Sequence, residues 1–202
     1  MKKEFLACVI MAFTLVVIGC ENKEAPVLLK LVQRDLNGQQ EYYDRIDYCF
    51  SKDCALVIMD AWEGRPVENL IPAIEIARMQ GIIIIFLLNG GELSPSLIVE
   101  STDYQVEEES AFREVLKENN IQVLIYAGYN TNQCVIAREA GIVAMSREYY
   151  CILLRDATQA SGGNVLGHSE KEIRDFTTYL VELNWGTSML VNGIEAIKYQ
   201  IN

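Results

Sequence analysis

The chain contains the stretch Leu124-Ile-Tyr-Ala-Gly128-Tyr-Asn-Thr-Asn-Gln-Cys134-Val135. Its apolar start is typical of a buried strand, and the glycine-containing turn leads into a helix predicted over 132–140 and closed by Gly141. A thiol in the first turn of a helix meets backbone N–H groups and the positive end of the helix dipole, which favour the thiolate. The stretch therefore predicts a strand, a turn and a helix with a cysteine placed for chemistry.

Further apolar runs and helical patterns alternate on both sides of this stretch. Short apolar runs typical of strands cover 55–59, 82–88, 123–127, 151–154 and 188–191. Helical patterns cover 65–80 (with Pro66 in its first turn), 107–119, 132–140, 171–183 and 194–199, and 89–105 is predicted to be a loop. Because the strands are almost continuously apolar, both faces of their sheet are expected to be covered. The sequence predicts an α/β fold: a three-layer α/β/α sandwich with a mostly parallel, open, Rossmann-like sheet.

The segment before residue 54 has two interpretations. Asn37-Gly38 suits a tight turn between strands at 28–32 and 42–48. A helix over part of this segment fits the sequence about as well.

The first twenty residues have the pattern of an export signal. Two lysines precede an apolar run over 5–18, which is too short to span a bilayer comfortably. The run ends in Val17-Ile18-Gly19-Cys20, which resembles a bacterial lipobox, so Cys20 is predicted to carry a lipid anchor; an uncleaved anchor helix is the alternative. We expect a signal peptide at 1–19, a tether and uncertain element at 20–48, and a catalytic-type domain at 49–202. The predicted location is the bacterial cell envelope, on a membrane and facing outside the cytoplasm.

The charge balance restricts the partners. The chain has 28 acidic and 17 basic residues, a net charge of −11, and no basic stripe of the kind that nucleic acids require. A small-molecule substrate and the lipid anchor are the expected partners, and a homo-oligomer is possible.

Two reactive side chains are expected at one edge of the sheet. Asp60 follows the strand at 55–59 directly, as Cys134 follows the strand at 123–127, and the carboxyl ends of parallel strands share an edge. A carboxylate there can act as a general base for the thiol, and backbone N–H groups of the turn can bind an oxyanion. The alternative is structural, with the aspartate capping a helix and the cysteine packing a helix onto the sheet.

Four motifs in order resemble the isochorismatase-like cysteine hydrolases, which include nicotinamidases, N-carbamoylsarcosine amidohydrolases and ureidoacrylate hydrolases. The motifs are Ala55-Leu-Val-Ile-Met-Asp60, Ser110-Ala-Phe112, the stretch over 124–135, and Arg155-Asp156-Ala157, and the resemblance covers about 55–198. It implies that Cys134 is the nucleophile and Asp60 the base in cleavage of an amide-like C–N bond through an acyl-thioester. It also implies a cis peptide at Tyr129–Asn130, which aims the N–H groups of Asn130 and Cys134 at the substrate oxygen.

The sequence departs from this family at the third catalytic position. The family's lysine lies four residues before the serine of Ser-Ala-Phe, where this chain has Val106, followed by Glu107, Glu108 and Glu109. The acidic run either faces the site or forms the exposed first turn of a helix. Two functions remain open: a divergent hydrolase in which another residue replaces the lysine, and a catalytically degenerate binding module on a lipoprotein tether.

The remaining candidates are aromatic residues, histidine and cysteines. Trp62, Tyr129 and Asn130 are expected by position to line a substrate pocket. The only histidine, His168, lies in a glycine-rich loop, so neither a bound metal nor another cofactor is predicted. Cys49 and Cys54 are close enough in sequence for a small disulfide loop, and Cys151 is expected to be buried and inert.

Overall fold

The computed structural model describes residues 28–34, 39–46, 51–163 and 167–197. The predicted signal peptide and Cys20 lie outside the described residues, so they stay predictions. Cys49 also lies outside them, and its pairing with Cys54 is a prediction for the same reason.

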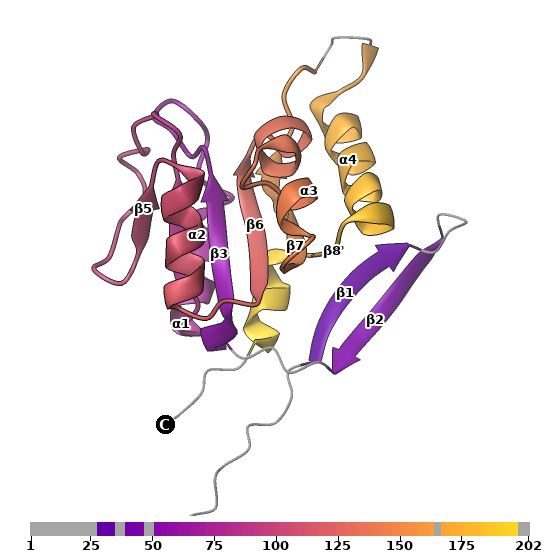
Figure 1. The fold of residues 1–202 in the computed structure, drawn as a ribbon. Coiled ribbons are helices and arrows are strands. Elements are labelled where there is room, and N and C mark those ends of the chain that lie inside the picture. Colours follow the sequence, from indigo (N-terminus) through magenta and orange to yellow (C-terminus); the bar gives the residue numbers. More distant parts are fainter. Residues whose placement is uncertain (1–27, 35–38, 47–50, 164–166, 198–202) are drawn as a thin grey trace, which may run out of the picture.

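An eight-stranded sheet forms the centre of the molecule, with the order β2-β1-β8-β7-β6-β3-β4-β5 (Figure 1). Six strands run parallel: β3 (Cys54–Met59), β4 (Ile83–Leu87), β5 (Tyr104–Val106), β6 (Val123–Tyr129), β7 (Tyr150–Gln159) and β8 (Thr187–Met189). The other two, β1 (Leu28–Arg34) and β2 (Gln40–Ile46), form an antiparallel hairpin, and β1 extends the sheet by pairing with β8. The hairpin interpretation of the N-terminal segment is therefore confirmed.

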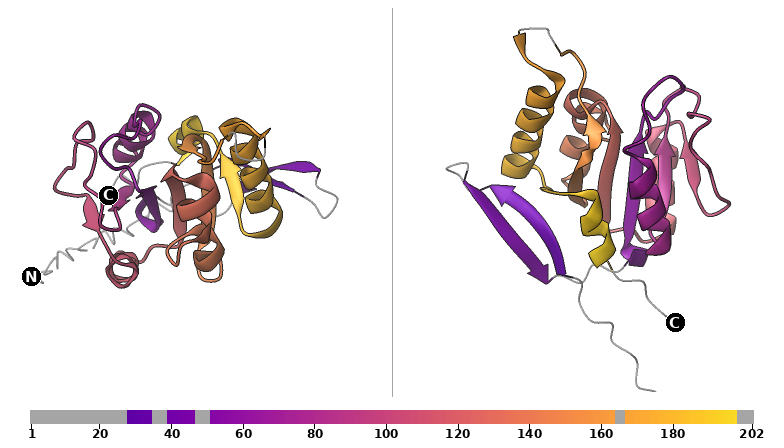
Figure 2. Two further views of the ribbon diagram at one scale, coloured as in Figure 1. Left: turned by 90° about the horizontal axis from the view of Figure 1, so that it is seen from above. Right: turned by 180° about the vertical axis from the view of Figure 1, so that it is seen from behind.

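Helices cover both faces of the sheet, as the two views of Figure 2 show. One face packs against α1 (Ile71–Met79) and the 3₁₀ helix η4 (Val191–Ala196), and the other against α2 (Glu109–Glu118), α3 (Ile142–Met145) and α4 (Glu170–Asn184). Successive residues of β3 alternate between these cores, with Leu56 and Ile58 in the first and Val57 and Met59 in the second. The predicted three-layer α/β/α sandwich is confirmed.

Several predicted boundaries were wrong, each for a local reason. The helix predicted from residue 65 begins at Ile71, because 67–70 form a hydrogen-bonded turn and Pro72, not Pro66, occupies the first helical turn. The predicted loop contains β5, whose three residues are too few to show a periodicity. Strand β7 continues to Gln159, across a register shift in its pairing with β6. Its second half contains polar residues, so the apolar pattern of the sequence ends before the strand does. The helix predicted over 132–140 is a π-helical turn, η2 (Thr131–Val135), with regular helix only at 136 and 137.

Gly128 allows the ends of β3 and β6 to approach each other. Its φ is +105°, and a Cβ at this position would lie 2.1 Å from the carbonyl oxygen of Met59. Only glycine avoids both the left-handed strain and the backbone collision. This close approach places the turn after β6 beside the residue that follows Met59, which is Asp60.

A Gly128→Ala variant should therefore be strongly destabilised. Backbone strain and overpacking each cost about 1–3 kcal/mol, so we expect the free energy of unfolding to fall by at least about 2 kcal/mol. Urea unfolding followed by circular dichroism measures it, with Gly162→Ala as the control: its φ is also positive (+86°), but no atom lies within 4 Å of its added Cβ. Equal losses in the two variants would show that the approach to Met59 is unimportant.

Candidate active site

The candidate site lies where the strand order of the sheet reverses. After β3 the chain builds β4 and β5 on one side, and it then returns to place β6, β7 and β8 on the other. Connections leave β3 and β6 in opposite directions, and ligand sites of open α/β sheets commonly lie at such a point, at the carboxyl ends of the strands. Asp60 follows β3 directly, and Asn130 to Cys134 follow β6. The two predicted reactive groups thus flank the switch point.

Asp60 is held in a fully buried position. It has 0 % exposure and a positive φ of 49°, and its backbone N–H donates to the carbonyl oxygen of Leu87 at 3.0 Å. Its Oδ2 accepts a hydrogen bond from Nη2 of Arg138 at 2.6 Å. Its Oδ1 is buried and has no hydrogen-bond partner of ordinary geometry among the described residues. Since Arg138 uses Oδ2, Oδ1 is the oxygen left for the thiol.

Cys134 is half-buried in η2, with its thiol next to Asp60. Burial raises the pKa of the thiol, and the neighbouring Asp60 carboxylate raises it further by accepting its hydrogen bond and by its negative charge. The positive charge of Arg138 and the backbone N–H of Asn130 lower the pKa in part. The predicted long helix after this turn is absent, so its dipole does not act on the thiol, and burial and the neighbouring carboxylate shift the pKa upward.

Arg138 is the residue that sequence reasoning missed. Val106, in the sequence position of the family's lysine, is buried at the end of β5 and pairs with Leu87. The positive charge that pairs with Asp60 belongs to Arg138, four residues after Cys134 in the sequence. That spacing was the available signal, because residues four apart in a helical segment lie on one face.

The acidic run lies beside this arginine and also forms a helix start. Glu107 accepts a hydrogen bond from the backbone N–H of Gly90 at 2.5 Å, and Glu109 begins α2 and pairs with Arg113 at 2.6 Å. The three glutamates line a pocket of about 310 Å³, together with Leu87, Asn89, Arg138, Glu139 and Ala140. The run is therefore the start of a helix, as one interpretation held, and it also lines a pocket that Arg138 shares.

The predicted pocket residues are brought together by a second arginine, Arg65. Its guanidinium carbon lies 4.9 Å from the ring centroid of Trp62 and 5.2 Å from that of Tyr129, and its Nη1 donates to Oδ1 of Asn130 at 2.9 Å. Trp62 Nε1 donates to the carbonyl oxygen of Leu88 at 2.6 Å. Tyr129 is only 3 % exposed, and its hydroxyl donates a hydrogen bond to the carbonyl of Pro66. Its ring is therefore part of the packing beneath the surface rather than an exposed pocket wall. The predicted cis peptide at Tyr129–Asn130 is confirmed.

The other sequence candidates lie apart from this site. His168 is exposed ahead of α4, and no group of three or more His, Cys, Asp or Glu side chains in the described residues is arranged to hold a metal ion. Burial raises the pKa of Cys151 to about 12. None of the helices in the described ranges is long and apolar enough to cross a membrane.

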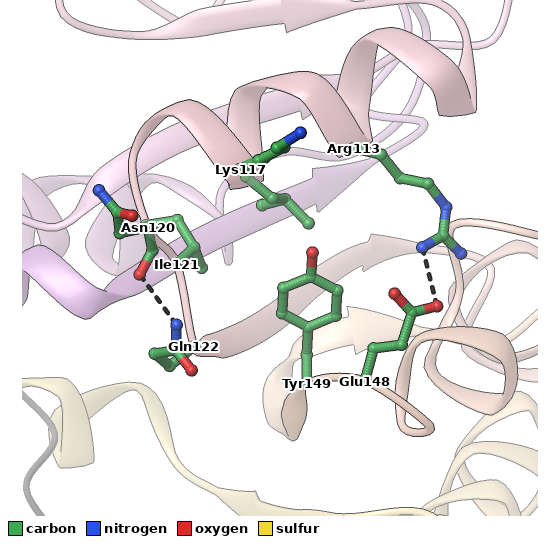
Figure 3. Close-up of a pocket in the computed structure, with 8 residues that line it drawn as sticks. Arg113, Lys117, Asn120, Ile121, Gln122, Glu148 and Tyr149 are labelled. Carbon is green, nitrogen blue, oxygen red and sulfur yellow. Dashed lines mark hydrogen bonds and ion pairs between the residues drawn. The ribbon is translucent and has the colours of Figure 1, made fainter.

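A pocket of about 450 Å³ lies at the opposite edge of the sheet, near the amino ends of β6 and β7 (Figure 3). It is lined by Arg113, Leu116, Lys117, Asn120, Ile121, Gln122, Glu148 and Tyr149. None of the reactive residues described above reaches it.

Comparison with known proteins gives the fold. The sequence model of the Isochorismatase domain matches residues 89–182, which include Cys134 but not Asp60. A cysteine hydrolase from Pseudomonas syringae pv. phaseolicola has a similar structure, with a TM-score of 0.63 at 16 % identity over 74 % of this chain and 94 % of that one. This chain has the isochorismatase-like fold.

Two further solved structures have the same fold. An isochorismatase family protein from Burkholderia thailandensis gives a TM-score of 0.59 at 16 % identity, over 72 % of this chain and 96 % of that one. YcaC from Pseudomonas aeruginosa, whose structure contains hexane-2,5-diol and covalent acrylamide, gives 0.57 at 18 % identity, over 74 % and 82 %. None of the curated protein sequences matches this chain.

Proposed function

We propose that the chain is a divergent cysteine hydrolase of the isochorismatase family, which cleaves an amide-like C–N bond of a small molecule. The observation that carries the proposal is the buried Asp60 carboxylate, placed between the Cys134 thiol and the Arg138 guanidinium. A buried carboxylate needs partners, and a structural aspartate would have both oxygens satisfied. Here Oδ2 is paired with Arg138, Oδ1 has no partner of ordinary geometry among the described residues, and the Cys134 thiol adjoins the carboxylate.

The reaction proceeds in two steps, acylation of Cys134 and hydrolysis of the acyl-thioester. Oδ1 of Asp60 takes the thiol proton as the sulfur of Cys134 attacks the substrate carbonyl carbon, and backbone N–H groups of the turn at Asn130 and Cys134 stabilise the oxyanion. The C–N bond breaks, and the amine leaves with the proton that Asp60 held. Water then attacks the acyl-thioester with Asp60 as base, which releases a carboxylic acid and restores the thiol.

Arg138 takes the part of the missing lysine in this mechanism. Its guanidinium pairs with the Asp60 carboxylate, which has no exposed surface, and its charge lowers the pKa of the Cys134 thiol. An arginine remains protonated throughout, so it acts as a fixed charge and does not exchange protons. We assign it a positioning role, through Asp60.

A catalytically degenerate binding module is the second candidate. Two observations favour it: Val106 takes the place of the lysine, and the pKa of the Cys134 thiol is raised, so most of the protein holds a neutral thiol at neutral pH. A module of this kind would keep the site and bind a small molecule without cleaving it.

An Asp60→Asn variant tests the proposal, because it should speed the alkylation of Cys134 and slow hydrolysis. Because the carboxylate raises the thiol pKa, its removal should lower that pKa and speed the alkylation of Cys134 by iodoacetamide at about pH 7.5. Loss of the general base should at the same time slow hydrolysis by about 10²–10⁴-fold. Mass spectrometry of the Cys134 peptide measures labelling, and ammonia release from a panel of primary amides and N-carbamoyl compounds measures hydrolysis.

The matched control is Glu118→Gln, which replaces an exposed carboxylate on α2 and should change neither readout. If the wild-type protein releases no ammonia from the whole panel while Cys134 still shows the Asp60-dependent labelling, the binding module is favoured. Hydrolysis unchanged in the Asp60→Asn variant would exclude the proposed base.

A further inference from the structure

A third pocket is lined by residues of β1, β7 and α4. Figure 1 shows the end of β1 close to α4, and the two elements are in contact. The volume of this pocket is about 260 Å³. Three of its six lining residues are arginines from different elements: Arg34 ends β1, Arg155 lies in β7 and Arg174 lies in α4. The others are Asp175, Thr178 and Glu182, so the pocket shares no residue with the candidate active site.

The acidic residues of this pocket already have partners. Glu182 is 1 % exposed; its Oε2 lies 2.7 Å from Nε of Arg34, and its Oε1 accepts a hydrogen bond from Ser188 Oγ at 2.6 Å. Asp175 pairs with Lys171 and lies 3.6 Å from Nη2 of Arg174. The lining residues carry three positive and two negative charges, which leaves one positive charge uncompensated.

Arg155 is the arginine of this pocket that has no carboxylate partner among the described residues. Its side chain forms no hydrogen bond or ion pair within the described part of the chain, and its Nε is buried without a partner. A buried guanidinium nitrogen without an acceptor is costly, and proteins seldom leave one. The protein as a whole has a net charge of −11, so a positive pocket of this kind is an exception in its surroundings.

We propose that this pocket binds an oxyanion group, a phosphate or a carboxylate of a small ligand. Planar guanidinium groups match both anions with paired hydrogen bonds, and Arg155 and Arg174 have donors that no protein carboxylate takes up fully. Because Arg34 belongs to the hairpin and Arg174 to α4, the bound anion also links the hairpin to the rest of the domain. This proposal stands independently of the hydrolase activity.

The test is a titration of the full chain with inorganic phosphate and, separately, with malonate, by calorimetry at constant ionic strength in chloride. We expect saturable binding of at least one anion, and Arg155→Gln should raise its Kd by about tenfold or more. The anion that binds more tightly identifies the ligand group. Binding should also raise the melting temperature of the wild-type protein more than that of the variant.

The matched control is Arg147→Gln, which removes an exposed arginine outside the pocket and should leave the Kd unchanged. Equal weakening by Arg147→Gln and Arg155→Gln would reveal general electrostatic attraction and overturn the proposal. Absence of saturable binding of both anions at millimolar concentration would overturn it too.

Discussion

A Cys134→Ala variant should lose its hydrolytic activity by about 10⁴-fold or more, because the Cys134 thiol is the proposed nucleophile that forms the acyl intermediate. Cys134 is the half-buried thiol beside Asp60, whereas the pKa of the buried Cys151 is raised to about 12, so it cannot substitute. Ammonia release from the amide panel, compared at equal protein concentration, measures the loss.

The control is Cys134→Ser, which preserves the shape of the side chain but provides a poorer nucleophile. Both variants should keep the melting temperature within a few degrees of the wild-type protein, since a half-buried thiol contributes little to the core. Activity in Cys134→Ala within tenfold of the wild type would contradict the proposed nucleophile, provided that the variant is folded.

An Arg138→Gln variant should be destabilised by about 3 kcal/mol, because it leaves the fully buried Asp60 carboxylate without a charge partner. We take the low end of the usual range because the Arg138 side chain is 20 % exposed, so water screens part of the interaction. The variant should also alkylate more slowly at Cys134, since Arg138 lowers the pKa of that thiol. Urea unfolding and iodoacetamide labelling measure the two effects.

A double variant, Asp60→Asn with Arg138→Gln, separates loss of the ion pair from loss of packing. It contains no unpaired buried charge, so we expect it to regain most of the stability that Arg138→Gln loses. If the double variant is as unstable as Arg138→Gln alone, the arginine stabilises the fold by packing and not by compensating Asp60.

The sheet and the location of the reactive pair could be predicted from the sequence because both depend on local patterns. Apolar runs such as 55–59 and 123–127 are short, β-prone and bounded by turn residues, so their strands were recognised. The carboxyl ends of parallel strands lie at the same edge of a sheet, so Asp60 and Cys134, which follow two such strands, are predicted to lie close together. The three-residue strand β5 and the second half of β7 were missed, because their residues show no such pattern.

The electrostatics of the site could not be predicted in this way. Whether Arg138 reaches Asp60 depends on the length of the helix after Cys134, and that segment forms a π-helical turn in place of a long regular helix. The direction of the thiol pKa depends on burial and on the distance to a carboxylate 74 positions away in sequence. The contact of Arg65 with Tyr129 likewise depends on two segments far apart in the sequence, 62–65 and the end of β6, lying side by side.

The most direct test of the central claim is the mass of the protein during turnover. Wild-type protein that is mixed with a hydrolysed primary amide and quenched in acid during the first turnovers should gain the mass of the amide minus ammonia. Peptide mapping should place this acyl group on Cys134, and Cys134→Ala should show no gain. Formation of the acid with no adduct on Cys134, or with an adduct on another residue, would contradict the account.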